Sequence, residues 1–272
     1  MIKINYLTMN NRSLDSEFVV APKYKLNTCY YGKSFSSMTL GLFCYLFDNR
    51  TFLSKYKHSV NKGADRRLCH SRNKYKSMKT VIDTYSKGND KDFFNNWKNI
   101  LVVRDPISRF ISGYVQLCVL SIGLPANHSN CFKCGKNMHC FLGKLYNKIK
   151  TFTGIKTNHD HFLAYHFLPQ KWRCEIGKYK QNYTILKYTK DKKNFYESYL
   201  QELRESGVPD QKLVFIKKLF YTTKVLHKTD GKKETKYFTN HLIKNKILIK
   251  MFLKIFYEDF IEFDFPLPNL EV

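Results

Sequence analysis

Two stretches of the sequence place cationic and hydroxyl side chains at the start of a predicted helix, which is the chemistry of an anion-binding site. The first is 99–118, NILVVRDPISRFISGYVQLC, in which Arg104 follows the apolar run 100–103. Asp105 and Pro106 then form a helix-start signature, with a carboxylate that can cap free amides and a proline suited to the first helical position. An arginine at such a junction is well placed to bind a phosphate. The alternative is a simple surface pair between Arg104 and Asp105.

The second stretch is 32–37, GKSFSS, which lies between a predicted strand and the apolar helix MTLGLFCYLF. Helix-start amides, serine hydroxyls and a mobile lysine can together hold a phosphate. The candidate ligands are Lys33, Ser34, Ser36 and Ser37. Asn27 stands where a Walker A loop requires glycine, which argues against an ATPase. A plain Gly-Ser turn remains the alternative.

A third group of candidates is formed by His159, His161 and His166 within 156–174. Imidazole titrates near neutrality, so a histidine beside an acceptor hydroxyl can take its proton as a general base. For each histidine separately, a hydrogen-bonded loop position is the alternative reading.

The composition describes a folded chain with a strong attraction to polyanions. Hydrophobic residues make up 43% of the 272 residues, and 47 Lys and Arg against 22 Asp and Glu give a net charge of +25. This charge favours nucleic acid, an anionic membrane surface or an acidic glycan as partner. Composition therefore limits the chemical class of the partner but does not indicate a reaction.

Eight cysteines and four N-x-S/T sequons, at Asn11, Asn49, Asn127 and Asn182, indicate a secretory lumen. Residues 1–18 lack an apolar run of signal-peptide length, so we expect an N-terminal extension without signal or membrane segment, and no membrane span elsewhere.

The loop that holds Cys131, Cys134, His139 and Cys140 has two possible chemistries. These residues offer four soft zinc ligands, but adjacent His139 and Cys140 are awkward for a tetrahedral site. Disulfides are the preferred reading for a luminal protein, although spacing does not reveal which cysteines pair.

The elements that must position these residues follow an α/β pattern. Strands are predicted at 19–31, with a turn near Ala21, at 99–104 and at 182–189, and helices follow the first two. A parallel sheet binds ligands beyond the carboxyl ends of its strands, so both anion candidates should lie on one edge. An amphipathic helix is predicted from 237 to 257. Its inward side chains should be Leu242, Ile247, Leu248, Phe252, Ile255 and Phe256.

With both anion stretches in view, the chain resembles the Golgi carbohydrate sulfotransferases related to chondroitin and HNK-1 sulfotransferases, in their nematode branch. That family has a C-x-x-x-K-S-x-S-T loop, which begins here at Cys29 and ends with Ser37 in place of threonine. Its R-D-P-x-x-R-x-x-S-G-Y motif is complete as Arg104, Asp105, Pro106, Arg109, Ser112, Gly113 and Tyr114. The resemblance continues at 137–141, 166–174, 227–229 and 257–260.

The resemblance implies a P-loop-like three-layer fold with a central parallel sheet, with a sulfotransferase domain at 19–265 and a tail at 266–272. It implies sulfuryl transfer, without metal, from 3′-phosphoadenylyl sulfate (PAPS) to a sugar hydroxyl. The expected acceptor is chondroitin, at the 4-position of N-acetylgalactosamine, in the Golgi lumen or membrane.

The resemblance also assigns roles to individual residues. Lys33 and the three serines of its loop are expected at the 5′-phosphosulfate, and Arg104, Arg109 and Ser112 at the cofactor's other end, with Arg104 and Ser112 on the 3′-phosphate. His166 is expected to be the base, so the catalytic pair is Lys33 and His166.

Two other classes stay open beside the enzyme. A basic nucleic-acid-binding protein would explain the charge, but it is not favoured because it leaves the RDPxxRxxSGY motif unexplained. A catalytically inactive homologue would keep its affinity for glycans and lose sulfuryl transfer. The replacement of threonine by Ser37 and the high lysine content are compatible with such a homologue.

Overall fold

The computed structural model describes residues 6–8, 14, 16–59, 69, 72–122, 128–223 and 229–269. The chain divides into two compact units. We call 15–104 with 174–226 the sheet unit, and 1–14 with 105–173 and 227–272 the helical unit. Among the helices of the described residues, none combines the length and apolar character needed to cross a membrane.

The sheet unit holds all the strands that the structure describes, in the order β3-β1-β2-β4-β5. The strands are β1 Phe18–Ala21, β2 Leu26–Cys29, β3 Lys74–Tyr75, β4 Lys98–Arg104 and β5 Tyr183–Tyr188. Its helices are α1 Ser36–Phe47, α2 Asn49–Ser59, α3 Met78–Ser86, α4 Asp90–Asn96, α8 Ile176–Tyr179, α9 Lys192–Glu205 and α10 Asp210–Thr222, with 3-10 turns η1 Pro22–Tyr24 and η5 Lys180–Asn182.

The strands β2, β4 and β5 run parallel, with Cys29 opposite Leu101 and Leu101 opposite Ile185. β1 is antiparallel to both β2 and β3, so the sheet is mixed at one side. The predicted turn near Ala21 is confirmed, because η1 there reverses the chain between β1 and β2. The expected parallel core is therefore present, with a hairpin added to it.

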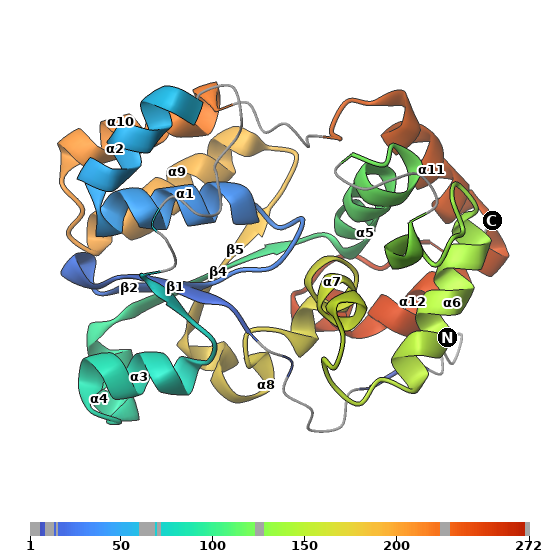
Figure 1. The fold of residues 1–272 in the computed structure, drawn as a ribbon, viewed down its shortest axis with the longest axis horizontal. Helices are drawn as coiled ribbons and strands as arrows, with labels where there is room; N and C mark the ends of the chain where they lie inside the picture. The colour runs from blue at the N-terminus through green and yellow to red at the C-terminus, as the bar shows by residue number, and fades with distance from the viewer. Residues whose placement is uncertain are drawn as a thin grey trace. The chain divides into compact units, whose positions relative to one another are not determined.

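Helices cover both faces of this sheet and give the unit three layers. In Figure 1, α1, α2, α9 and α10 lie on one face, and α3, α4 and α8 lie on the other. The five central residues of β4 are all buried, which is why this strand is a continuous apolar run without alternation. The predicted three-layer α/β fold is thus confirmed for the sheet unit.

The helical unit is built from α5 Pro106–Tyr114, α6 Met138–Lys150, α7 Asn158–His166, α11 Lys233–Lys244 and α12 Lys246–Glu262, with shorter η2 Val115–Val119, η3 Ser129–Cys131 and η4 Gln170–Trp172. Its core is rich in aromatic rings. Phe110 of α5 is fully buried, and its ring lies 5.4 Å from that of Phe252 and 5.9 Å from that of Tyr114. The aromatic side chains of α5 therefore form part of the core of the helical unit.

The single helix predicted from 237 to 257 is wrong, because the structure has two helices there. Asn245 separates them, and its side-chain oxygen accepts hydrogen bonds from the amides of Ile247 and Leu248, which makes it the N-cap of α12. The break changes the helical phase, so Ile247, predicted to point inward, is 62% exposed. The remaining five predicted inward residues are buried.

All eight cysteines are paired in four disulfides: Cys29–Cys174, Cys44–Cys69, Cys118–Cys131 and Cys134–Cys140. Two of these bridges, Cys118–Cys131 and Cys134–Cys140, use cysteines that were candidate zinc ligands. The disulfide reading of that loop is therefore confirmed, and three of the four candidate zinc ligands are half-cystines. Four disulfides are typical of proteins of the secretory pathway.

Candidate functional site

The predicted anion loop connects β2 to α1 in the sheet unit. Two of its residues that are not glycine have left-handed backbone angles, Lys33 at φ 72° and Phe35 at φ 63°. Left-handed residues in a turn gather successive amides into a concave anion-binding nest. α1 begins at Ser36, and Ser34 and Ser36 are buried in the loop and first turn. Backbone geometry and serine positions are therefore both suited to an anion.

The structure brings Arg104 next to this loop. Arg104 ends β4, which pairs in parallel with β2, so the two strands present their carboxyl ends on one edge. Its Nη1 donates a hydrogen bond to the carbonyl oxygen of Lys33 at 3.1 Å. The predicted adjacency of the two anion stretches is therefore confirmed for Arg104 and Lys33.

Sequence reasoning missed an aromatic residue on this edge. Tyr188 ends β5, and its ring centroid lies 5.4 Å from the Arg104 guanidinium and 3.7 Å from the Lys192 ammonium. Both separations are within the range of cation–π attraction. The signal available in the sequence was a tyrosine at the end of a third parallel strand. The edge therefore carries Lys33, Arg104 and Lys192 in a connected arrangement.

The remaining predicted site residues, Arg109, Ser112 and His166, belong to the helical unit. Ser112 lies on α5 and accepts a 3.3 Å hydrogen bond from the hydroxyl of buried Thr229. This contact joins Thr229 to the RDPxxRxxSGY motif. His227 itself lies outside the described residues.

Arg109 and Gly113, one helical turn apart on α5, both contact the chain around His166. The Arg109 guanidinium is buried and donates to the carbonyl oxygens of Leu168 at 2.8 Å and Tyr165 at 3.5 Å. A Cβ on Gly113 would lie only 3.0 Å from the ring of Phe167, so glycine permits this close approach. The second half of the RDPxxRxxSGY motif therefore fixes the segment 165–168.

Asp259 of α12 holds the next part of the same segment. Its carboxylate accepts hydrogen bonds at 2.8 Å from the backbone amides of Gln170 and Lys171. Burial raises the pKa of Asp259 to about 6, while these amides and the positive charge of Arg109 act in the opposite direction. A buried arginine and a buried aspartate thus hold consecutive parts of the segment that follows α7.

The three candidate histidines differ in their surroundings. His166 is the last residue of α7 and is partly exposed, and its ring centroid lies 4.8 Å from those of Phe162 and Tyr165. His161 is exposed on the same helix. Burial lowers the pKa of His159, which contacts Phe132. His166 is the one of the three that lies in the segment fixed by Arg109.

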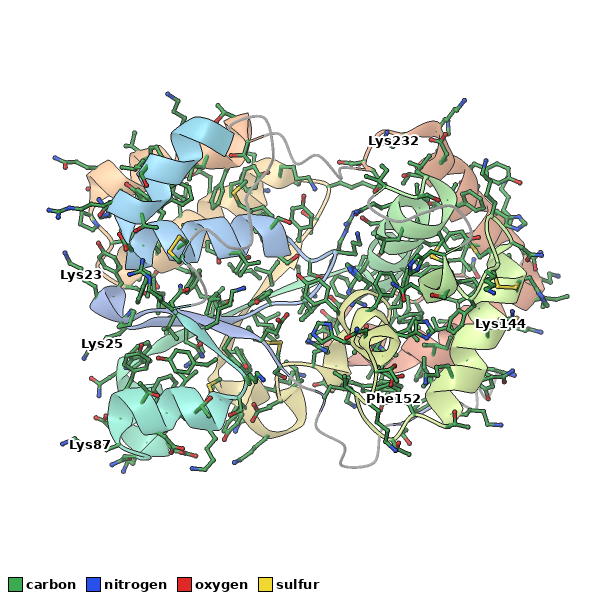
Figure 2. The ribbon with its side chains drawn as sticks, in the orientation of Figure 1. Lys23, Lys25, Lys87, Lys144, Phe152 and Lys232 are labelled. Carbon is green, nitrogen blue, oxygen red and sulfur yellow. A yellow bond between two sulfur atoms is a disulfide. The ribbon has the colours of Figure 1, made fainter. Side chains whose placement is uncertain are left out.

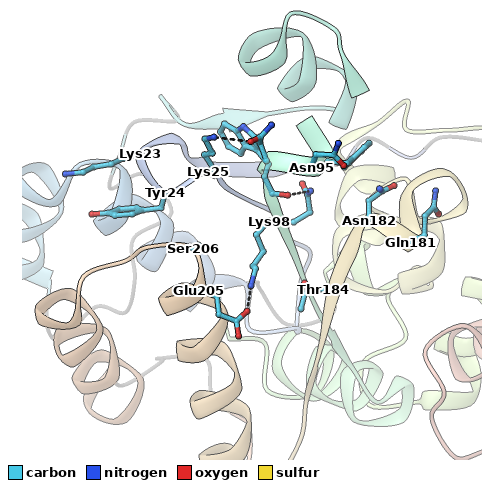
Figure 3. A pocket seen from close by; sticks show the side chains of 14 residues that line it. Lys23, Tyr24, Lys25, Asn95, Lys98, Gln181, Asn182, Thr184, Glu205 and Ser206 are labelled. Atoms are coloured by element: carbon cyan, nitrogen blue, oxygen red, sulfur yellow. Dashed lines mark hydrogen bonds and ion pairs between the residues drawn. The ribbon is translucent and has the colours of Figure 1, made fainter. Parts of the chain in front are cut away.

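A pocket of about 600 Å³ in the sheet unit lies at the opposite end of the strands (Figure 3). Its lining includes Lys25, Lys98 and Thr184, which mark the amino ends of β2, β4 and β5. Lys98 is held by Glu202 and Glu205 at 2.7 and 2.6 Å. We do not assign the cofactor to this pocket, since the anion loop is at the carboxyl ends.

Many lysine side chains extend outward from the ribbon in Figure 2, including the labelled Lys23, Lys87, Lys144 and Lys232. Side chains of this kind carry the positive charge of the sequence, which has 47 Lys and Arg. In the part of the chain that the structure covers, no group of three His, Cys, Asp or Glu residues is arranged to hold a metal ion.

The fold is an α/β fold with a candidate anion-binding edge, and comparison with known proteins gives its family. A sequence model of the sulfotransferase family matches residues 16–266. Over 260 residues the chain is 30% identical to carbohydrate sulfotransferase chst-1 of Caenorhabditis elegans, spanning 93% of this chain and 76% of that protein. It is 31% identical to the uncharacterized protein C18B2.2 of the same nematode, over 94% and 70% of the two chains. No solved structure gives a significant match. The chain belongs to the sulfotransferase family.

Proposed function

We propose that this protein is a PAPS-dependent carbohydrate O-sulfotransferase whose domain spans 19–265. The observation that carries the proposal is the hydrogen bond from Arg104 to the Lys33 carbonyl, which joins the two predicted phosphate ligands in a member of the sulfotransferase family. One cofactor with two separated phosphates would use both residues. PAPS has this chemistry, and its sulfuryl group is the one transferred.

The loop after β2 is suited to the 5′ end of PAPS. The left-handed Lys33 and Phe35 curve the backbone, and Ser34, Ser36 and Ser37 add hydroxyl donors. When the sugar oxygen bonds to sulfur, the bond from sulfur to the 5′-phosphate oxygen breaks and negative charge grows on that phosphate. Lys33 would stabilise this charge, since positioning and electrostatics dominate in-line transfer by analogy with phosphoryl groups.

The 3′-phosphate is assigned to Arg104 and Ser112. A guanidinium can bind a phosphate through two parallel hydrogen bonds, which suits selection of a phosphorylated ribose. The hydrogen bond from Thr229 fixes the Ser112 hydroxyl on α5. Arg109 stays a predicted cofactor residue, although its buried contacts give it a second task in holding the 165–168 segment.

His166 is assigned as the general base that takes the proton of the sugar hydroxyl. Its place at the end of α7, directly before the residues fixed by Arg109 and Gly113, supports a defined position. His166→Ala should lower transfer at least about hundredfold while binding of adenosine 3′,5′-bisphosphate (PAP) stays intact. His161→Ala, on the same helix and exposed, is the matched control and should transfer normally. Unchanged turnover in His166→Ala would remove the residue from this role.

A glycan acceptor is supported by the relative described as a carbohydrate sulfotransferase and by the net charge of +25. We extend this to chondroitin, with the 4-position of N-acetylgalactosamine as the hydroxyl. The four disulfides support a secretory-pathway location, for which the Golgi is the proposed compartment.

The test is transfer of labelled sulfate from PAPS to a panel of chondroitin, dermatan, heparan and desulfated glycans. Lys33→Ala is the control and should lose most of the transfer. Transfer to none of the glycans, despite PAP binding, would favour an inactive glycan-binding homologue. Tight binding of duplex nucleic acid without affinity for PAP would favour the nucleic-acid-binding class.

A further inference from the structure

Phe35 occupies a backbone conformation that its side chain does not favour. Its φ of 63° is left-handed, where a bulky residue is a genuine outlier because its Cβ crowds the backbone. Such strain persists only where surrounding contacts hold it, and it is concentrated at ligand-binding segments. Contacts of the surrounding residues must therefore hold Phe35 in the middle of the anion loop.

The ring of Phe35 is anchored in an aromatic cluster of the sheet unit. Five ring centroids lie 5.0 to 6.1 Å from its own, and they come from β5, α9 and α10: Tyr188, Phe195, Tyr196, Tyr199 and Phe220. The ring of Phe195 meets it edge to face at 84°. Aromatic pairs at such distances add to the gain from apolar burial. The cluster therefore offers a fixed socket for this one side chain of the loop.

The backbone of Phe35 connects this socket to the helix start. Its carbonyl oxygen accepts hydrogen bonds from the amides of Met38 and Thr39, both at 3.1 Å, and from the Thr39 hydroxyl at 3.2 Å. The two residues between, Ser36 and Ser37, are candidate ligands at the first turn of α1. Phe35 thus joins the aromatic cluster, through its ring, to the first turn of α1, through its carbonyl oxygen.

The same socket reaches the second anion candidate. Tyr188 lies 5.3 Å from Phe35 and also carries Arg104 over its ring at 5.4 Å. Arg104 in turn donates to the carbonyl of Lys33. Phe35, Tyr188, Arg104 and the Lys33 carbonyl are therefore connected in series at the proposed cofactor edge.

We infer that Phe35 is a positioning residue, which holds the anion loop in its binding geometry before the cofactor arrives. The identity of the ligand, PAP or PAPS, rests on the proposed function. The effect of Phe35 on the loop does not depend on it. A loop that is already ordered loses less conformational entropy on binding, so removing the anchor should weaken affinity more than it slows the chemical step.

Three variants distinguish the contribution of the Phe35 ring to binding from that of its left-handed backbone angle. Phe35→Ala removes the anchor, Phe35→Leu keeps an apolar side chain for the socket, and Phe35→Gly accepts the left-handed angle without strain but has no side chain. In Phe35→Ala and Phe35→Gly we expect the PAP dissociation constant and the KM for PAPS to rise about tenfold. In Phe35→Leu both values should stay within about threefold of those of the parent protein. The kcat should change less than the KM.

The matched control is Phe52→Ala. Phe52 is buried on α2 of the same unit, against Tyr45 at 5.4 Å and Phe215 at 6.3 Å. It should lower stability to urea as a core truncation does, yet leave PAP affinity unchanged. Comparable loss of affinity in Phe52→Ala would mean that the effect of Phe35 is only general destabilisation.

Hydrogen exchange of the amides of 33–37 tests the anchor without any ligand. In Phe35→Ala and Phe35→Gly these amides should exchange faster than in the parent, under conditions where both proteins remain folded. Exchange equal to the parent would overturn the inference. Parent affinity for PAP in Phe35→Gly would also overturn it, since the angle alone would then suffice. A parent protein that does not bind PAP would contradict the proposed function, while the exchange result would still decide the role of Phe35.

Discussion

Arg109 donates a 2.8 Å hydrogen bond from its Nη1 to the carbonyl oxygen of Leu168, and this bond ties the helix of the RDPxxRxxSGY motif to the segment that contains His166. Both residues are buried, and Arg109 also contributes a favourable positive charge at Asp259, which holds the following residues. The arginine that the family resemblance predicts at the cofactor is therefore also a structural link inside the helical unit.

Replacing Arg109 should separate its two assigned roles. Arg109→Met leaves the Leu168 carbonyl without this donor and Asp259 without the nearby positive charge, so we expect a loss of about 3 kcal/mol in urea unfolding. Arg109→Lys keeps the charge and should lose less. Exposed Arg204→Met is the control and should change stability by less than about 0.5 kcal/mol.

Kinetics on the folded fraction of the Arg109 variants complete this test. As a positioning residue Arg109 should affect turnover more than PAP affinity, because its contacts hold the His166 segment. A drop in PAP affinity larger than the drop in turnover would instead support direct contact with the cofactor.

Arg104→Ala should abolish selection for the 3′-phosphate. We expect PAP affinity to fall about 10- to 100-fold, the equivalent of lost charge-assisted hydrogen bonds, while affinity for adenosine 5′-monophosphate stays nearly constant. Calorimetric titration with the two nucleotides measures this difference. Arg72→Ala, an arginine of the same unit that pairs with Asp48, should leave both affinities unchanged. An equal loss for both nucleotides would place Arg104 elsewhere in the site.

The Cys29–Cys174 disulfide should be the more stabilising of two contrasting bridges. It spans 145 residues and begins at the last residue of β2, three residues before Gly32 of the anion loop, whereas Cys134–Cys140 spans 6. Chain entropy predicts losses of about 5 and about 2 kcal/mol for the two bridges. Urea unfolding of the paired alanine variants compares them. Equal losses would show that loop length does not govern their contribution.

Asp160 should make the free energy of unfolding depend on pH in the acid range. Burial of its carboxylate is outweighed by hydrogen bonds from Lys148, Thr157 and the Lys156 amide, which lower its pKa from 3.8 to about 2. A lowered pKa in the folded state gives stability that is present above about pH 4 and is lost as pH falls toward 2. The stability difference between parent and Asp160→Asn should therefore shrink from pH 5 to pH 2. A constant difference across that range would contradict the shift.

The main elements were predictable because local signals and tertiary packing agree. Local signals and packing favour the same structure in three places: the buried apolar strand β4, the start of α5 at Asp105 and Pro106, and the apolar helix α1. The predicted helix at 237–257 failed at Asn245, where a capping side chain outweighed a continuous apolar pattern. Periodicity did not show this break, since leucine and isoleucine continue on both sides of it.

The sequence by itself determined the family motifs, the positions of the three parallel strands β2, β4 and β5, and the residue types at the anion loop, because these depend on local spacing and helix-start chemistry. Only the tertiary structure decided that Phe35 is anchored among five aromatic rings, that Arg104 bonds to Lys33, and which cysteines pair. These contacts join residues far apart in the chain. Their partners are chosen by packing of the whole unit, and no local pattern specifies that packing.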